Sequence, residues 1–325
     1  MEYKILVITP VKHINGLQGI LESAGSVTYL DDPSMEEVIS IVYDYDAIFT
    51  NPNKSNVFIG KDLLDAAKKL KVICTASTGT NHIDMTYAKK LCLPIISLTE
   101  ERDVINRISS TAELAFSLTL ASLRHVVKSY KAVQRGEWDY EKFIGRQMNY
   151  LTVGIVGYGR LGTMYSNYCK AFDSKVLVYD PYKKVDDQGI EQVSSLECLL
   201  KESDVVAIHV HLTEETKGMI NKSSFDMMKP SVVIVNTARG DIVNELDLIN
   251  FLKANPDARM ATDVLANEVT NKKNNPLLKY SLKSDQIIIT PHIGGMCIEA
   301  QEIAYEHAAS LLDKFMKNID EKNNP

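Results

Sequence analysis

The sequence predicts an α/β fold built from doubly wound parallel sheets. Short apolar and β-branched runs alternate with helical segments along nearly all of the 325 residues. A glycine-rich turn follows one of these runs near the middle of the chain. Strand–helix alternation on this scale requires parallel strands with helices on both faces of each sheet. The length fits about two domains at roughly 150 residues per domain.

Several runs have the β-branched, apolar composition of buried strands. They are Lys4–Thr9, Ala47–Thr50, Val72–Ala76, Pro94–Ser97, Leu151–Val156, Lys175–Tyr179, Val205–Val210, Val232–Asn236, Arg259–Thr262 and Gln286–Thr290. A long helix is expected from about 109 to 134, with Ser110 and Glu113 spaced as a capping box. Ser194 with Glu197 has the same spacing, and Asn244 can cap a helix over 245–253.

The charge balance argues against nucleic acid or an anionic membrane as a partner. Lys and Arg number 36 against 42 Asp and Glu, so the net charge is 36 − 42 = −6. The chain shows no signal peptide and no apolar run long enough to span a membrane. Its five cysteines form no C-x-x-C pair, and its histidines and cysteines lack metal-ligand spacing. These features predict buried reduced thiols, a cytoplasmic protein and no metal site.

The glycine-rich turn has the pattern G-x-G-x-x-G, with glycines at Gly157, Gly159 and Gly162 and with Arg160 and Leu161 between the last two. It follows an apolar strand and opens a helical stretch, which is the context that this pattern needs to be meaningful. The first glycine permits a tight turn, and the second lets the backbone approach a pyrophosphate. The third lets the helix pack closely on the strand, so that its first amides face the phosphates. The turn therefore predicts a Rossmann-type dinucleotide site.

Asp180 ends the next predicted strand, 180 − 162 = 18 residues after the last glycine of the turn. An acidic residue at about this spacing accepts hydrogen bonds from the ribose hydroxyls of NAD and repels the 2′-phosphate of NADP. The sequence thus predicts NAD as the cofactor, although Lys183 and Lys184 lie close by.

Three later strand ends carry side chains capable of chemistry. Arg239, Asp263 with Glu268, and His292 each follow a predicted buried strand, and ligands of open α/β sheets bind beyond the carboxyl ends of strands. Taken alone, each residue has a structural interpretation: the arginine could be ion-paired, the glutamate solvated and the histidine hydrogen-bonded. Their joint occurrence behind a dinucleotide turn favours a reactive site. His209 either lines the cofactor groove or has a structural role.

These motifs together resemble the NAD-dependent D-2-hydroxyacid dehydrogenase family. The resemblance covers nearly the whole chain and rests on four ordered motifs: the glycine turn with Asp180, Asn236-Thr-Ala-Arg239-Gly, Asp263-Val-x-x-x-Glu268, and Pro291-His292-Ile-Gly-Gly. It implies that a dinucleotide domain, residues 100–295, is inserted into a flavodoxin-like substrate domain formed by residues 1–99 and 296–325. It also implies a homodimer, with the helix near 109–134 contributing to the interface.

The resemblance implies a role for each residue of the catalytic trio. Arg239 would hold the carboxylate and carbonyl oxygens of a 2-oxo acid, and His292 would be the general acid/base as hydride passes to or from the nicotinamide. Glu268 would hydrogen-bond His292 and favour its protonated form.

By the same resemblance, other residues would bind the cofactor or the substrate. Asp263 would contact the nicotinamide amide, and the segment Thr237, Ala238 and Arg239 would contact the adjoining ribose. Gly294 and Gly295 complete the implied cofactor site. The loop that contains Ser77, Thr78 and Gly79 would offer backbone amides to the substrate carboxylate.

Within the family, the sequence is most similar to the phosphoglycerate dehydrogenases, without the regulatory C-terminal domain that many of them carry. Lys54 stands in a segment where such enzymes commonly present an arginine to a phosphorylated substrate. The substrate therefore stays open among phosphohydroxypyruvate and the substrates of sibling glyoxylate, hydroxypyruvate, D-lactate, formate or phosphite enzymes. An NAD-sensing binding protein of the same fold is the alternative from another functional class.

Overall fold

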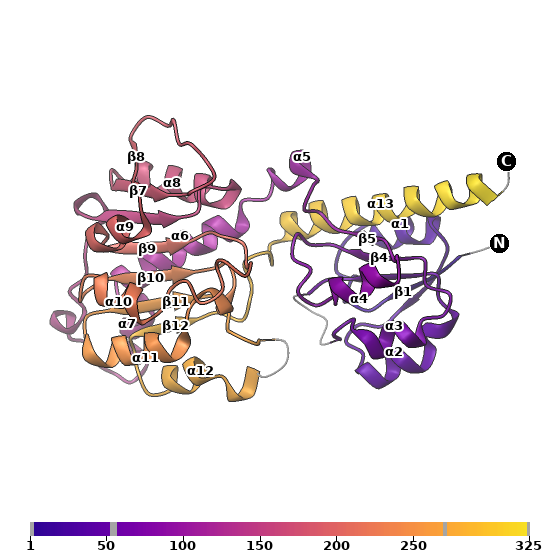
Figure 1. The fold of residues 1–325 in the computed structure, drawn as a ribbon. Helices are drawn as coiled ribbons and strands as arrows, with labels where there is room; N and C mark the ends of the chain where they lie inside the picture. The colour runs from indigo at the N-terminus through magenta and orange to yellow at the C-terminus, as the bar shows by residue number, and fades with distance from the viewer. Residues whose placement is uncertain (1–2, 53–56, 269–271, 324–325) are drawn as a thin grey trace. The chain divides into compact units, whose positions relative to one another are not determined.

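The structure is a computed structural model that describes residues 3–52, 57–268 and 272–323. The chain divides into two compact units, Met1–Ile108 with Met296–Pro325, and Ser109–Gly295 (Figure 1). Both units contain an all-parallel sheet with helices on its two faces, which confirms the predicted fold class. In the described ranges, no helix combines the length and the apolar character needed to cross a membrane.

The first unit contains a five-stranded sheet in the order β2-β1-β3-β4-β5, the flavodoxin-like order. Its elements are β1 Lys4–Val7, α1 Leu17–Ser23, β2 Ser26–Tyr29, α2 Met35–Ile41, η1 Val42–Asp44, β3 Ala47–Thr50, α3 Lys61–Ala66, β4 Val72–Thr75, α4 Met85–Lys90, β5 Ile95–Ile96, α5 Arg102–Ile105 and α13 Ile298–Asn323. Alternate strand residues pack on opposite faces: Ile5 and Phe49 lie in the core under α1 and α13, whereas Leu6 and Ile48 lie under α2 and α3.

Contacts of α13 bring the C-terminal segment back to the first unit. His307 Nε2 lies 2.7 Å from Glu101 Oε2, and Cys74 donates its thiol hydrogen to the carbonyl of Ala308 at 3.3 Å. Ile105 of α5 is buried in the same core. Residues 100–108 therefore belong to the first unit, whereas the sequence analysis placed the cut after residue 99.

The second unit contains a seven-stranded sheet in the order β12-β11-β10-β9-β6-β7-β8, in which the direction of strand succession reverses between β6 and β9. Its elements are α6 Ser110–Leu123, α7 Val126–Gln134, η2 Tyr140–Phe143, η3 Met148–Tyr150, β6 Thr152–Val156, α8 Arg160–Ala171, β7 Lys175–Tyr179, β8 Ile190–Gln192, α9 Leu196–Glu202, β9 Val205–Ile208, α10 Lys222–Met227, β10 Val233–Asn236, η4 Gly240–Ile242, α11 Glu245–Ala254, β11 Arg259–Thr262, η5 Lys272–Asn274, α12 Pro276–Ser281 and β12 Ile287–Ile289. Helices α6 and α8 cover one face of the sheet, and α9 to α12 cover the other.

The predicted helix over 109–134 is wrong as a single element, because the chain breaks it into α6 and α7 at His125. His125 has a φ of 53°, in the left-handed region that ends regular helices. The predicted capping box at Ser110 is also wrong. Ser109 is the N-cap residue, and its hydroxyl bonds the Glu113 side chain rather than a backbone amide.

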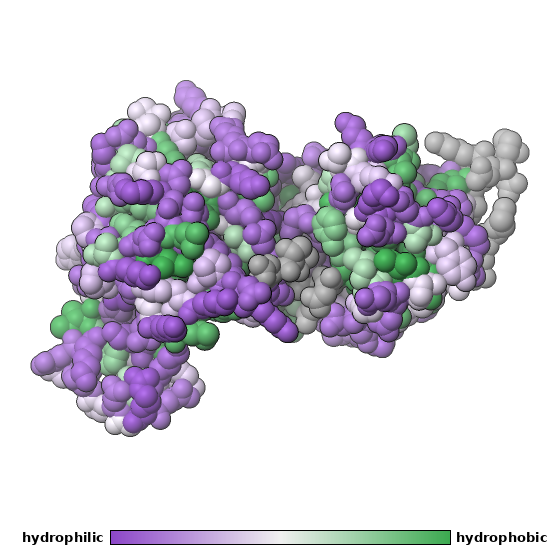
Figure 2. All heavy atoms as spheres, turned by 60° about the horizontal axis from the view of Figure 1, so that its bottom comes forward, coloured by the Kyte–Doolittle hydropathy of each residue, from purple (hydrophilic) through white to green (hydrophobic). Residues whose placement is uncertain are grey.

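Large apolar side chains are exposed in the segment that follows α6. They are Val126, Tyr130, Val133, Trp138, Tyr140, Ile144 and Tyr150. Figure 2 shows apolar residues in several separate places on a surface that is otherwise mostly hydrophilic. Contiguous exposed apolar patches mark interaction surfaces, so the segment 126–150 is a candidate for one.

Candidate active site

The glycine-rich turn joins β6 to α8 at the position where the sheet reverses its strand order. Gly157 has a φ of 93°, and a Cβ there would lie 2.7 Å from the carbonyl oxygen of His209. A Cβ on Gly162 would lie 2.1 Å from the carbonyl oxygen of Gly157, so α8 can approach the strand only with glycine at this position. A Cβ on Gly159 would meet no atom within 4 Å. Protein packing does not require the second glycine, and the open space beside it fits the approach of a pyrophosphate.

The N-terminus of α8 faces this open space with Arg160, Leu161 and Gly162 in its first turn. Gly159 is the N-cap residue and gives the helix no side-chain cap. The amides at the start of a 12-residue helix therefore carry the partial positive charge that attracts phosphate.

Asp180 follows β7 and is held by three backbone amides. Its Oδ2 accepts the N–H of Tyr158 at 2.8 Å, and its Oδ1 accepts the N–H groups of Tyr182 at 2.9 Å and Lys183 at 3.1 Å. The ammonium of Lys183 donates to the carbonyl of Tyr158 at 3.0 Å. The carboxylate is thus fixed beside the glycine turn, where the sequence predicts the ribose-binding acid.

Two buried polar atoms at the ends of β9 and β10 have no hydrogen-bond partner among the described residues: His209 Nε2 and Thr237 Oγ1. Thr237 follows β10, and such an orphaned hydroxyl at the carboxyl edge fits a site completed by a ligand. The ring of His209 packs instead on Tyr165 of α8, with the ring centroids 5.0 Å apart. Burial lowers the pKa of His209 to about 4, so the ring is neutral at physiological pH.

Arg239 lies in a turn that the side chain of Asn236 braces. Asn236 Nδ2 donates to the carbonyl of Arg239 at 2.9 Å, and Asn236 Oδ1 accepts the N–H of Ala238 at 3.0 Å. The guanidinium is largely enclosed, and it donates to the carbonyl of Ala238 at 2.6 Å. Burial lowers the pKa of Arg239, and the charge of Glu268 opposes that shift. The brace aims a cation at the carboxyl edge of the sheet.

Glu268 and His292 form a close pair at the ends of neighbouring strands β11 and β12. Glu268 Oε1 lies 2.7 Å from His292 Nδ1, and Glu268 Oε2 accepts the N–H of Leu265 at 3.2 Å. Burial alone would raise the pKa of Glu268, but the hydrogen bond and charge of His292, with Arg239 nearby, lower it below its usual value. Because the carboxylate occupies Nδ1, the ring leaves Nε2 for another group.

Asp263 holds the segment that carries His292. It accepts the N–H groups of Ile293 at 2.9 Å and Gly294 at 2.7 Å, and the hydroxyl of Thr290. Burial raises the pKa of Asp263, and these donors and the charge of His292 oppose the rise. Gly294 packs closely here, since a Cβ would lie 3.2 Å from Asp263 Oδ2, and Gly295 is the last residue of the unit. Thr290 had no signal in the sequence beyond its place at a strand end.

The predicted substrate loop lies in the first unit, directly after β4. The hydroxyl of Ser77 donates to the carbonyl of Gly79 at 2.7 Å, and Thr99 Oγ1 donates to the carbonyl of Thr78 at 3.0 Å. These bonds fix the loop at the carboxyl edge of its own sheet. Lys54 lies outside the described residues.

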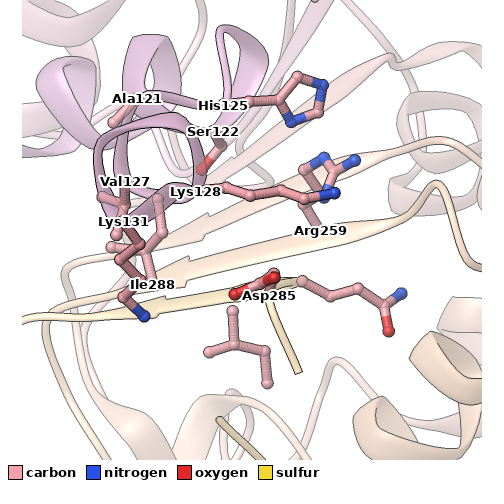
Figure 3. Close-up of a pocket in the computed structure, with 11 residues that line it drawn as sticks. Ala121, Ser122, His125, Val127, Lys128, Lys131, Arg259, Asp285 and Ile288 are labelled. Atoms are coloured by element: carbon pink, nitrogen blue, oxygen red, sulfur yellow. The ribbon is translucent and has the colours of Figure 1, made fainter. Parts of the chain in front are cut away.

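A small cavity lies at the opposite, amino-terminal edge of the second sheet (Figure 3). Ser122, His125, Lys128, Arg259 and Asp285 are among its lining residues, and its volume is about 20 Å³. This volume suits about one water molecule, so the cavity is too small for a metabolite. Among the described residues, no cluster of three His, Cys, Asp or Glu side chains could hold a metal ion.

Comparison with known proteins defines the class of this chain. Residues 116–294 match the family described as D-isomer specific 2-hydroxyacid dehydrogenase, NAD binding domain. A hydroxypyruvate reductase from Thermotoga maritima is 31% identical over 284 residues, which cover 87% of this chain and 88% of the relative. The chain belongs to the D-isomer specific 2-hydroxyacid dehydrogenase family, and NAD is the cofactor of its second unit.

Other relatives are consistent with this membership. A D-3-phosphoglycerate dehydrogenase from Archaeoglobus fulgidus is 34% identical over 301 residues, which cover 92% of this chain and 54% of the relative. The chain spans about half the length of the D-3-phosphoglycerate dehydrogenases that it matches. The crystal structure of D-lactate dehydrogenase from Aquifex aeolicus, complexed with NAD and lactic acid, has 28% identity and a TM-score of 0.81. The structural match covers 97% of this chain and 96% of the D-lactate dehydrogenase chain.

We predict that His209 makes the free energy of unfolding pH-dependent. The pKa of His209 is about 4 in the folded chain and about 6.5 when unfolded, so the unfolded state takes up the proton first as the pH falls. The contribution is fully present above pH 6.5 and is lost as the pH falls through 4, with a loss of up to about 3 kcal/mol. In urea titrations at several pH values, His209→Phe should flatten this dependence relative to the wild type. Parallel curves for the two proteins would contradict the prediction.

Proposed function

We propose that this protein is an NAD-dependent oxidoreductase that interconverts a small 2-oxo acid and the corresponding D-2-hydroxy acid. The observation that carries the proposal is the placement of Arg239 and the Glu268–His292 pair at the carboxyl ends of three adjacent strands, β10 to β12, in an NAD-binding domain. A cation that can bind a carboxylate lies on the same sheet edge as a histidine that can carry a proton.

The glycine turn, Asp180 and Thr237 are the residues that would hold NAD. The space beside Gly159, the uncapped start of α8 and the orphaned hydroxyl of Thr237 all fit such a ligand. When bound, NAD supplies or accepts the hydride. His209 is less suited to the cofactor role predicted from sequence, because its ring packs on Tyr165.

His292 would transfer the proton of the reaction. In the reductive direction the carbonyl carbon gains a hydride and the carbonyl oxygen takes the proton from His292 Nε2, which leaves the ring neutral. Glu268 stays ionised because its pKa is lowered, and it stabilises the protonated ring and holds its orientation. In the oxidative direction the neutral ring removes the hydroxyl proton.

Arg239 would bind the substrate carboxylate and polarise the carbonyl. One of its five N–H donors is engaged by the carbonyl of Ala238, and the planar fork retains others for a bidentate contact. Asp263 acts on His292 through the backbone of Ile293 and Gly294, so we assign it a positioning role in addition to the predicted contact with nicotinamide.

The substrate class follows from the relatives rather than from a described substrate contact. The names of the similar proteins include D-3-phosphoglycerate dehydrogenase and hydroxypyruvate reductase. We propose a short 2-oxo acid such as phosphohydroxypyruvate, hydroxypyruvate or glyoxylate, with Ser77, Thr78 and Gly79 offering amides to its carboxylate. The five free cysteines support a reducing compartment such as the cytoplasm.

We predict that the protein oxidises NADH with at least one 2-oxo acid from a panel of phosphohydroxypyruvate, hydroxypyruvate, glyoxylate and pyruvate. With the best substrate, His292→Ala should lower kcat by about 10²–10⁴-fold, the usual contribution of general acid–base catalysis. The Kd for NADH, measured by fluorescence titration, should stay nearly unchanged. Wild-type turnover in the variant would remove His292 from the acid/base role, and an inactive wild type across the panel would argue against the proposed reaction.

We predict that Asp180 sets the preference for NADH over NADPH. Asp180→Ala removes a fixed negative charge, so the ratio of kcat/KM for NADPH to that for NADH should rise at least about tenfold. Asp186→Asn removes an exposed negative charge from the same segment and serves as the matched control, which should keep the wild-type ratio. An equal ratio in the wild type and Asp180→Ala would exclude the assignment.

We propose that the exposed apolar segment 126–150 forms a homodimer interface. Trp138 is the single tryptophan of the chain and is 89% exposed in the isolated protomer. Burial in a dimer should shift its emission to shorter wavelength, and dilution should reverse the shift. Sedimentation over the same concentrations should show a dimer that dissociates. A monomer at all concentrations would contradict the proposal.

A further inference from the structure

Glu245 is a buried carboxylate that the proposed reaction does not use. It lies in the first turn of α11 and is only 7% exposed. Its Oε1 accepts the N–H of Ala266 at 2.8 Å, and its Oε2 accepts Asn275 Nδ2 at 2.7 Å. Burial of a carboxylate costs free energy unless hydrogen-bond donors satisfy it, and these two donors do so. The position of Glu245 is therefore specific, and we ask what its bonds hold in place.

Asn275 holds the same peptide from its other side. Its Nδ2 also donates to the carbonyl of Ala266 at 3.2 Å, while its Oδ1 caps α12 by accepting the N–H of Leu278 at 3.0 Å. Both polar groups of Ala266 are therefore bonded to one pair of side chains. We refer to Glu245 and Asn275 as the Ala266 clamp.

The clamped residue lies two positions before Glu268. Asn267, between them, has a φ of 53°, a left-handed conformation that needs support from its surroundings. The turn that carries Arg239 packs directly on the peptide bond between Leu265 and Ala266. A Cβ on Gly240 would lie 2.0 Å from the carbonyl carbon of Leu265 and 2.2 Å from the nitrogen of Ala266. A shift of this peptide would thus displace Glu268 and press on the arginine turn.

The clamp borders a cavity on one side. Glu245, Asn275, Ala266 and Asn267 line a cavity of about 320 Å³ that Lys217 and Asp241 also border. Burial raises the pKa of Glu245, the donors on Ala266 and Asn275 oppose the rise, and the charge of Asp241 adds to it. The cavity gives the Ala266 peptide room to move, so removal of a bond should let it shift.

We propose that Glu245 and Asn275 are positioning residues that fix the Ala266 peptide and thereby keep Glu268 within hydrogen-bond distance of His292. This inference rests on the proposed function in so far as it assigns the pair a purpose in catalysis. The charged groups around the His292 ring are Glu268 and Asp263, with Arg239 interacting through Glu268. The clamp touches none of the reacting atoms and acts only through the backbone.

The first test is Glu245→Gln, which keeps the shape of the side chain. One of its two terminal atoms becomes an N–H₂ group that faces a donor, so the clamp loses a bond. We expect kcat for NADH-dependent reduction of the best 2-oxo acid to fall about tenfold, as expected from a small misplacement of a catalytic group. The Kd for NADH should not change.

Asn275→Asp tests the other member of the clamp. The aspartate can still accept the N–H of Leu278, but it can donate neither to Glu245 nor to the carbonyl of Ala266. We expect kcat to fall at least as far as in Glu245→Gln. Asp247→Asn removes a charge from the same first turn of α11 without touching Ala266, and it should match the wild type.

A second readout does not depend on turnover. The hydrogen bond between His292 Nδ1 and Glu268 can be followed by NMR in histidine-labelled protein, with His292→Ala used for assignment. Loss of this bond in Glu245→Gln should move the Nδ1–H proton resonance upfield. An upfield move supports the clamp even if the wild type reduces no 2-oxo acid, which would overturn only the proposed function. An unchanged resonance with unchanged kcat would overturn the clamp while the proposed function stands. Wild-type kcat in a folded Asn275→Asp variant would also overturn the role of Asn275 in the clamp.

Discussion

The interaction on which the second unit depends is the bonding of carboxylates to backbone amides at the carboxyl edge of its sheet. Asp263 accepts the amides of Ile293 and Gly294, and Asp180 accepts those of Tyr158, Tyr182 and Lys183. Chain segments that leave parallel strands have unpaired amides, and an ionised acceptor bonds them more strongly than a neutral one. The parallel sheet supplies adjacent strand ends, and the carboxylates convert them into fixed loops.

This constraint explains how residues in and beside the site hold strained positions. His292 has a φ of 56° and Asn267 a φ of 53°, and such left-handed conformations cost on the order of 1–3 kcal/mol each for residues other than glycine. A hydrogen bond to a charged acceptor contributes about 1.5–3 kcal/mol, so one or two at each place offset the strain. The bonds of Asp263 serve this purpose at His292, and those of Glu245 and Asn275 lie beside Asn267.

The fold class and the strand ends could be predicted from the sequence because they depend on local patterns. Apolar runs mark β6, β9 and β10 whatever their neighbours are, and Asn244 caps α11 as expected. The edge strands β2 and β8 were not predicted, since they are short and contain no buried residue. The cap of α9 is Ser195 rather than the predicted Ser194. The hydroxyl of Ser195 accepts the N–H of Cys198, so the helix begins one residue later than the capping-box spacing indicates. Burial of the cysteines was predicted from apolar neighbours and holds for Cys74 and Cys169, whereas the other three are exposed.

The parts of the site that the sequence did not reveal are long-range side chain to backbone bonds. Glu245 is 21 positions from Ala266, and Asn275 is 30 positions from Glu245. In sequence, Glu245 is an ordinary acidic residue in the first turn of a helix, where it complements the helix dipole. In the fold, Glu245 bonds the loop after β11, which the turn at Gly240 also approaches closely. Motifs identify the groups that bind the substrate. The residues that fix those groups in position are defined by contacts across the fold, so a structure is needed to find them.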